Sequence, residues 1–377
     1  MTLSDVRQRL TETGNSEHFL LFWSKPRGIH PGKVGRDLAF CYVQWLEDVY
    51  SRLLGPPFRR TPSERPKIPV YMLNPAKLFP AFSGPVMDID ESGPWLLLPD
   101  EIEGQEEADT IAGVAREVTR MFNGFERNPR HPSTAAWAWF DAAFAETVAD
   151  SVRSGERRSQ PIRTPFLGSF EARGAEEYGR AFVNRLMDII GLQGLNKLWM
   201  EGARNPGMTP MELLEREALV PLEYVLPRFH QDWYLRHTVL TLNEEESDGH
   251  SLEVLPGGSV KRDGALDHGA CRWYRLRLRH DLESIDVALQ LRSTASRIVG
   301  HVGVVDDAGQ YQSIRRLDSH GDGSLSTRLS EVGADRHVTL ILSNCGTRGV
   351  RQTGINHDDR QYYSLLIEAI TSAASGA

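Results

Sequence analysis

The chain has 377 residues, of which 40% are hydrophobic and 25% are charged. This composition is typical of a globular protein with a large core, and the length allows two or three domains. The net charge of −8 weighs against a nucleic-acid or anionic-membrane partner, because neutralising phosphates requires clustered lysine and arginine.

Targeting signals are missing from the sequence as it stands. The N-terminal segment MTLSDVRQRLTETGNSEHF lacks the apolar core of a signal peptide, and no segment approaches the ~18 apolar residues of a membrane span. Cys41, Cys271 and Cys345 are too few and too scattered for a disulfide framework or a zinc cluster. We therefore expect a cytoplasmic protein, unless an export signal has been removed.

The first part of the chain alternates strands and helices. Residues 17–23 (EHFLLFW) read as a strand, and apolar residues recur at helical spacing from Val34 to Leu54, where Gly55 and two prolines end the helix. Further strands are expected at 67–73 (KIPVYML) and 94–98 (PWLLL), before two helices within 109–150. This order predicts a sheet backed by helices.

The remainder changes from helices to strands. Residues 174–237 read as helices, with a capping box at Thr209 and Glu212. After residue 237, short alternating runs such as 274–279, 285–291, 338–342 and 362–367 predict an antiparallel β-sandwich. We expect an α+β fold with three parts: an α+β subdomain over 1–160, a helical subdomain over 161–237, and a C-terminal β-sandwich over 238–377.

The most informative motif is Arg116-Glu117-x-x-Arg120, in the first helix of the 109–150 pair. Apolar residues at steps of three and four face a core, and the two arginines lie one turn apart on the other side. The spacing is that of the zinc-peptidase helix His-Glu-x-x-His, in which two imidazoles hold zinc and the glutamate is the general base. A guanidinium group has no lone pair to offer a metal, so the motif predicts a zinc-site geometry without zinc.

Nearby carboxylates suggest a structural role for the arginines. The second helix offers Asp141 and, one turn later, Glu146. Clustered carboxylates are costly unless a cation neutralises them. We hypothesise that Arg116 and Arg120 replace the metal and cross-link the two helices through forked hydrogen bonds to Asp141 or Glu146. The alternative, which these residues alone favour, is an ordinary helix with a solvated Arg/Glu face.

Several stretches in this order, SEHFLLFW, a long helix ending in LG, KIPVYML, AREVTRMF and WAWFDAAFAETV, resemble a family of secreted zinc metalloproteases, the gluzincin-like MXAN-type and DUF6055 group. The likeness covers residues 16 to 150 and implies a zincin-like domain. It places the family's zinc ligands on Arg116, Arg120 and Asp141 and its general base on Glu117. Only Glu117 is kept in kind, so the resemblance implies the fold and argues against the metal chemistry.

Other candidate residues are weaker. His30 lies in the loop GIHPG and could enter the cleft, and His131 lies in the turn between the two key helices, where it could pair with Glu117. Glu146 is a further candidate for the cleft. No G-x-S-x-G elbow, Walker loop or dinucleotide fingerprint occurs. We expect a catalytically degenerate pseudopeptidase that needs no metal or other cofactor and binds a protein or peptide partner, with Glu117 at the vestigial general-base position. The alternatives are an active peptidase or hydrolase with a non-standard site, and a structural subunit of a larger assembly.

Overall fold

The computed structural model describes residues 8–25, 33–60, 67–74, 76, 84–90, 93–102, 107–126, 133–152, 176–205, 207–217, 221–241, 251–278, 282–293, 296–306, 310–333, 337–346 and 360–370. His30 and His131 lie outside these residues. The chain forms two compact units: unit 1 comprises Met1–Arg158 with Val183–Pro206, and unit 2 comprises Ser159–Phe182 with Gly207–Ala377. The segment 161–237, expected to be a separate helical subdomain, is divided between the two units.

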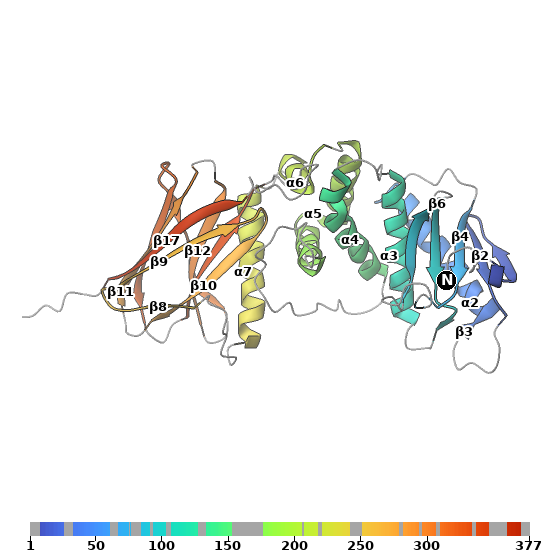
Figure 1. Cartoon of the computed structure of the whole chain (residues 1–377), viewed down its shortest axis with the longest axis horizontal. Helices are drawn as coiled ribbons and strands as arrows, with labels where there is room; N and C mark the ends of the chain where they lie inside the picture. The colour runs from blue at the N-terminus through green and yellow to red at the C-terminus, as the bar shows by residue number, and fades with distance from the viewer. Residues whose placement is uncertain are drawn as a thin grey trace, which may run out of the picture. The chain divides into compact units, whose positions relative to one another are not determined.

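A five-stranded sheet organises unit 1 (Figure 1). Its strands, in spatial order, are β1 (Glu12–Asn15), β2 (Phe19–Trp23), β4 (Ile68–Met72), β6 (Gly93–Leu98) and β5 (Val86–Asp90). Strands β2, β4 and β6 are parallel, whereas the edge strands β1 and β5 are antiparallel to their neighbours. Strand β6 is buried along its whole length, as is usual for a strand with both faces covered. Strands β3 (Lys33–Val34) and β7 (Glu101–Ile102) form a separate short pair.

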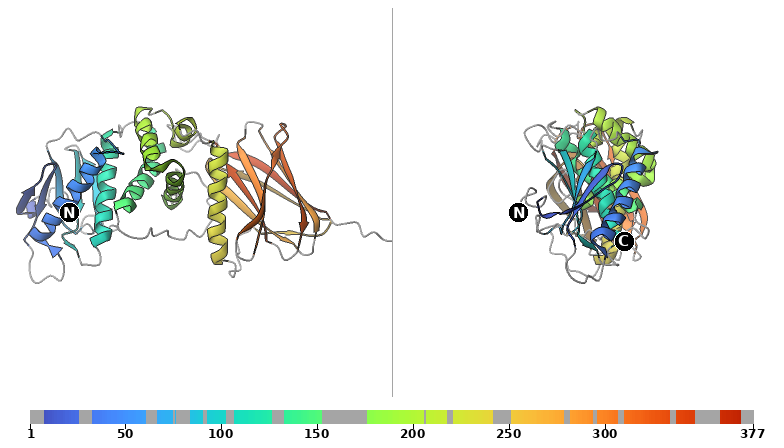
Figure 2. Two further views of the ribbon diagram at one scale, coloured as in Figure 1. Left: turned by 180° about the vertical axis from the view of Figure 1, so that it is seen from behind. Right: turned by 90° about the vertical axis from the view of Figure 1, so that its right-hand side faces the viewer.

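Helices α2 (Gly35–Leu54) and α3 (Glu107–Glu126) lie side by side on one face of this sheet (Figures 1 and 2). The α2 stripe that the sequence predicted is buried, and it comprises Leu38, Tyr42, Leu46, Val49 and Leu53. The opposite face of the sheet carries a smaller cluster around Tyr71, Trp95 and Leu97. The sheet is therefore covered mainly by α2 and α3.

Helix α4 (Ser133–Val152) and the later part of α5 (Glu176–Arg204) complete unit 1. Trp137 of α4 is fully buried and packs where α5 carries Gly202, since a Cβ atom there would lie 2.3 Å from the indole ring. Asn196 of α5 donates hydrogen bonds to the carbonyl oxygens of Pro57 (2.8 Å) and Phe58 (2.9 Å). These contacts attach α5 to α4 and to the loop that follows α2.

Two five-stranded sheets dominate unit 2 and share one hydrophobic core (Figure 1). One sheet has the order β13-β12-β16-β10-β8 and the other β14-β15-β11-β17-β9. The strands are β8 (Ser251–Val254), β9 (Ser259–Leu266), β10 (Cys271–Leu278), β11 (Leu282–Leu291), β12 (Ile298–Val305), β13 (Tyr311–Arg316), β14 (Asp318–Ser319), β15 (Ser324–Val332), β16 (His337–Asn344) and β17 (Gln361–Ile370). The expectation of a β-rich C-terminal part is confirmed. The pairing is antiparallel except between β8 and β10, which are parallel.

The helices of unit 2 belong to the same body as these sheets. Helix α7 (Leu222–Thr241) packs along β16 and β12 on the face of the sheet that is turned away from the shared core (Figure 1). Tyr234 of α7 contacts Trp273 of β10 edge to face, with 5.4 Å between ring centroids. Helix α6 (Pro210–Glu217) begins with the predicted capping box. Among the described helices, none is long and apolar enough to cross a membrane.

Candidate functional site

Helix α3 carries the Arg116-Glu117-x-x-Arg120 motif and is buried around most of its circumference. The predicted apolar stripe packs inward, with Val114, Val118, Met121 and Phe122 fully buried. Glu117 is also buried, with only 2% of its side chain exposed. An ionised carboxylate is rarely found at such burial unless it is paired and hydrogen-bonded. The solvated Arg/Glu face, the simpler alternative from the sequence, therefore does not describe Glu117.

Among the described residues, three N–H donors bind the Glu117 carboxylate. Arg116 Nε donates to Oε1 (2.9 Å), and Arg120 Nη1 donates to Oε2 (3.0 Å). The backbone N–H of Met87 in strand β5 also donates to Oε2 (3.2 Å). Two guanidinium groups and one backbone amide thus compensate the buried charge.

The Met87 contact joins the motif to the edge of the sheet. Strand β5 is the edge strand, and the residue before it, Pro85, touches α3 at Gly113, where a Cβ atom would lie 2.8 Å from the proline ring. One helical turn from Gly113 to Glu117 thus runs beside Pro85 and Met87. A helix that covers an edge strand prevents the unpaired N–H groups of that strand from pairing with a strand of another chain. Glu117 takes part in this cover by accepting the amide of Met87.

Arg116 also links α3 to α4. Its Nη1 donates a single hydrogen bond to Glu146 Oε1 (3.2 Å), so Arg116 does cross-link the two helices, but without the expected fork. The cross-link expected from Arg120 was wrong, because among the described residues Arg120 bonds only to Glu117 of its own helix. Burial lowers the pKa of the Arg116 guanidinium, but Glu117 and then Glu146 raise it, and the pKa ends above its ordinary value. Arg116 therefore remains a cation in this site.

Asp141 lies in a different set of contacts. It accepts a hydrogen bond from the indole Nε1 of Trp199 in α5 (2.7 Å), and within the described part of the chain neither Arg116 nor Arg120 bonds to it. Asp141 and Glu146 are five residues apart, about 140° around a helix, so they point to different neighbours. The structure therefore brings Glu146 to the arginines and directs Asp141 to α5.

A further arginine near Asp141 was not singled out from the sequence. Arg60 has only 3% of its surface exposed, and its guanidinium carbon lies 3.2 Å from the centroid of the Trp199 ring. Phe144 of α4 lies on the same guanidinium, with the carbon 5.4 Å from that ring centroid. Arginine stacking on aromatic rings is a common way to bury this side chain. No local pattern around Arg60 predicts it, because its partners come from α4 and α5.

The guanidinium groups around Glu117 limit the chemistry that this site can perform. A general base needs a carboxylate oxygen that can take a proton from water, but both oxygens of Glu117 already accept hydrogen bonds from cations. The positions that would hold zinc in a His-Glu-x-x-His helix are guanidinium groups, which cannot coordinate a metal. Within the described residues, no group of three or more His, Cys, Asp or Glu side chains is placed to hold a metal ion. The arrangement is suited to holding charge in place.

Asn123 adds an unusual feature to the same helix. It lies seven residues after Arg116, almost two turns on, and therefore on the same side of α3. Only 4% of it is exposed, and its side-chain amide makes no hydrogen bond within the described part of the chain. A buried polar group without a partner costs stability.

Unit 2 contains a buried polar network that joins four segments of the chain. The hydroxyl group of Tyr178 in α5 donates to the carbonyl oxygen of Gly269 (2.8 Å) and lies within hydrogen-bond distance of His230 Nε2 in α7. His230 Nδ1 is 2.7 Å from Ser343 Oγ in β16. Burial lowers the pKa of His230 to about 3, so the ring is neutral near pH 7. A neutral imidazole has one donor and one acceptor nitrogen, so the hydroxyl groups of Tyr178 and Ser343 contact one of each.

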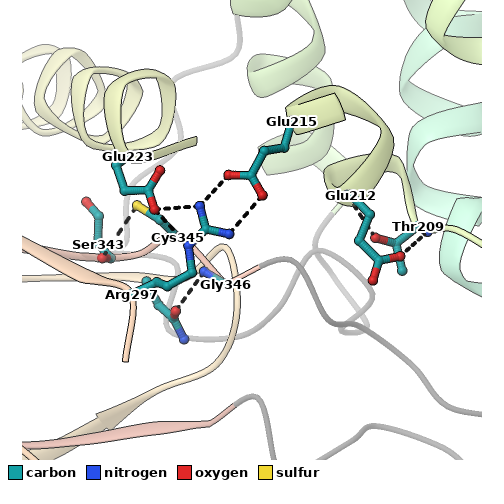
Figure 3. Close-up of polar contacts among 9 residues, drawn as sticks. Thr209, Glu212, Glu215, Glu223, Arg297, Ser343, Cys345 and Gly346 are labelled. Carbon is teal, nitrogen blue, oxygen red and sulfur yellow. Dashed lines mark hydrogen bonds and ion pairs between the residues drawn. The ribbon is translucent and has the colours of Figure 1, made fainter. Parts of the chain in front are cut away.

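Unit 2 also contains a charged cluster, which joins α6, α7 and the start of β12 (Figure 3). Arg297 donates hydrogen bonds to both carboxylate oxygens of Glu215, from Nη1 to Oε2 (2.9 Å) and from Nη2 to Oε1. Its Nε also donates to Oε1 of Glu223 (2.7 Å). The hydrogen bonds that Arg297 donates to Glu215 are the largest influence on the pKa of its guanidinium group and, with Glu223, raise that pKa. The capping box lies nearby, with Thr209 N 2.8 Å from Glu212 Oε2. Tyr178 and His230 are thus held by hydrogen bonds, and Arg297 by ion pairs, inside unit 2.

Comparisons with known proteins give little beyond this geometry. No protein-family model and no curated protein matches the sequence. A search of solved structures returns the pre-peptidase C-terminal domain of collagenase from Bacillus anthracis, at 12% identity over 33% of this chain and 100% of that chain, with a TM-score of 0.23. It also returns PliG of Aeromonas hydrophila, a periplasmic inhibitor of g-type lysozyme, at 13% identity over 32% of this chain and 98% of that chain, with a TM-score of 0.20. Likenesses at these TM-scores carry no argument about this chain.

Proposed function

We propose that this chain is a zincin-like pseudopeptidase that works without a metal and acts by binding a protein or peptide partner, as a scaffold or regulator. The observation that carries the proposal is the occupation of Glu117. Its buried carboxylate is held by Arg116, Arg120 and the amide of Met87, in the position where a zinc peptidase needs a free general base between two metal ligands.

The order of elements supports the zincin-like part of the proposal. Strand β2, the long helix α2, strand β4, the antiparallel edge strand β5 and strand β6 precede the motif helix α3 in chain order, and α4 follows it. The sequence resemblance to gluzincin-like metalloproteases covers these same elements. At the positions that this resemblance assigns to the zinc ligands, the chain has Arg116, Arg120 and Asp141.

The chemistry of the substitution supports a role in binding rather than catalysis. Arginine cannot lower the pKa of a bound water or polarise a carbonyl as zinc does, but it can neutralise carboxylates. Arg116 and Arg120 together balance the formal charges of Glu117 and Glu146. The cluster can thus stabilise the domain in place of a metal. The surface of the domain is then available to bind a partner.

A proteolysis assay tests the proposal. The full chain is incubated with an unfolded protein such as denatured casein, with and without added zinc, next to the matched variant Glu117→Gln. We expect the same background cleavage in all four samples, since Glu117 does not act as a base. Zinc-dependent cleavage by the native chain that Glu117→Gln abolishes would overturn the proposal and indicate an active peptidase.

A further inference from the structure

The charges of the α3 motif are arranged in layers from the interior to the surface of unit 1. Glu117 is at the bottom with 2% of its side chain exposed, Arg116 and Glu146 are about one-third exposed, and Arg120 is the outermost with 46% exposed. The negative charge is therefore innermost and a positive charge is outermost. Of the four side chains, Arg120 is therefore the most accessible to a ligand.

One nitrogen of the Arg120 guanidinium group is bonded to Glu117, and the other two nitrogens are available to a ligand. Its Nη1 donates to Glu117, whereas Nε and Nη2 make no hydrogen bond within the described part of the chain. The Nε and Nη2 groups form one edge of the planar fork, and this edge matches the two oxygens of a carboxylate. The contact with the buried Glu117 fixes the group before any ligand binds, which reduces the entropy lost on binding.

Arg116 supplies a second donor beside this edge. Its Nε and Nη1 are used by Glu117 and Glu146, and its Nη2 makes no hydrogen bond to a described residue. Arg116 and Arg120 hold the two different oxygens of the same Glu117 carboxylate, so their guanidinium groups are neighbours. Nη2 of Arg116 is thus a further donor next to the bidentate edge of Arg120 that no described residue uses.

We infer that Arg116 and Arg120 form a recognition site for a carboxylate group of a polypeptide partner. This inference deepens the proposed function and rests on it, because it assigns the partner's chemistry to the position that a metal would occupy in a zincin. A carboxylate carries one charge and fits the planar fork in two parallel hydrogen bonds. A phosphate dianion fits less well, because Glu146 already lies against Arg116 and would repel the second charge.

The same chemistry could come from a glutamate or aspartate side chain or from a C-terminal carboxylate. Three short peptides separate these sources: Ac-Ala-Ala-Glu-Ala-Ala-NH2 has only a side-chain carboxylate, Ac-Ala-Ala-Gln-Ala-Ala-OH has only a C-terminal one, and Ac-Ala-Ala-Gln-Ala-Ala-NH2 has none. Each is titrated into the full chain while NMR follows the arginine Nε–H signals. Inorganic phosphate is titrated separately.

We expect at least one carboxylate peptide to bind about tenfold more tightly than the peptide without a carboxylate and to shift the Arg120 Nε–H signal, as a charge-assisted pair of hydrogen bonds should. Which peptide binds identifies the source. Arg120→Lys keeps the cation for Glu117 but removes the fork, so it should weaken that peptide about tenfold.

The matched control is Arg204→Lys. Arg204 pairs with Glu201 three residues away in α5, in unit 1, as Arg120 pairs with Glu117, but it is 66% exposed and its partner is not deeply buried. This control should leave binding unchanged. The inference is overturned if the three peptides bind equally or not at all, if phosphate binds more tightly than both carboxylate peptides, or if Arg204→Lys weakens binding as much as Arg120→Lys. None of these outcomes depends on the cleavage assay, so the inference and the proposed function can fail separately.

Discussion

Replacing the guanidinium group of Arg116 by an apolar end tests whether the arginines stabilise the domain as a metal would. Arg116→Met deletes two charge-assisted hydrogen bonds, at 2.9 Å to Glu117 and 3.2 Å to Glu146, and keeps most of the aliphatic volume. Losing one partner of a fully buried ion pair costs about 3–5 kcal/mol. Arg116 is one-third exposed and Arg120 still neutralises Glu117, so we expect a smaller loss of about 2–3 kcal/mol.

The assay is urea unfolding followed by tryptophan fluorescence, fitted to the transition of unit 1, because two units need not unfold together. Arg204→Met removes an exposed pair and should change stability by no more than about 0.5 kcal/mol. A double-mutant cycle with Glu117→Gln should show a coupling of about 1–2 kcal/mol, because Glu117→Gln already removes the charge that Arg116 helps to compensate, so the second substitution costs less. An Arg116→Met protein as stable as the native chain, or a cycle without coupling, would refute the reasoning.

Three further predictions follow from single contacts. In the unfolded chain His230 binds a proton near pH 6.5, whereas in the folded chain it binds one only near pH 3. As the pH falls from 6.5 to 3, the free energy of unfolding of unit 2 should therefore decrease by about 1.4 kcal/mol per pH unit. His230→Phe should remove this pH dependence from urea unfolding. Arg116→His with Arg120→His should retain about one zinc per chain after dialysis, with Glu146 as the added ligand, whereas no retained zinc would count against a vestigial metal site. Asn123→Leu should stabilise unit 1 by about 1 kcal/mol in thermal unfolding, because the buried amide has no partner among the described residues, and a loss of stability would mean that the amide is bonded.

Periodicity alone predicted most of the elements. The helix expected over 34–54 is α2 at Gly35–Leu54, and the strand expected over 94–98 is β6 at Gly93–Leu98. Each has a strong apolar pattern bounded by glycine or proline, so local and tertiary preferences agree. Strand β5 was not predicted, because its sequence VMDID carries two aspartates, which are depleted in strands and tolerated here at a sheet edge.

The site was predicted less completely, for reasons that lie in tertiary structure. The helical spacing of Arg116 and Arg120 indicated that they share a face, but nothing local indicates that Glu117 between them is buried against β5. The choice between Asp141 and Glu146 depended on the phase of α4, which the sequence leaves open until Trp199 is known to lie on one side. The Tyr178, His230 and Ser343 network is beyond sequence reasoning, because its members are up to 165 residues apart and polar side chains of these types are usually exposed.

The metal content of the native protein tests the central claim most directly. The purified chain is analysed for zinc by elemental analysis, and its thermal unfolding is measured with and without a chelator. If the guanidinium groups of Arg116 and Arg120 have replaced a metal, zinc will be well below one per chain and the chelator will leave the melting temperature unchanged. Stoichiometric zinc, with a melting temperature lowered by the chelator, would contradict the account and mean that metal ligands lie elsewhere in the chain.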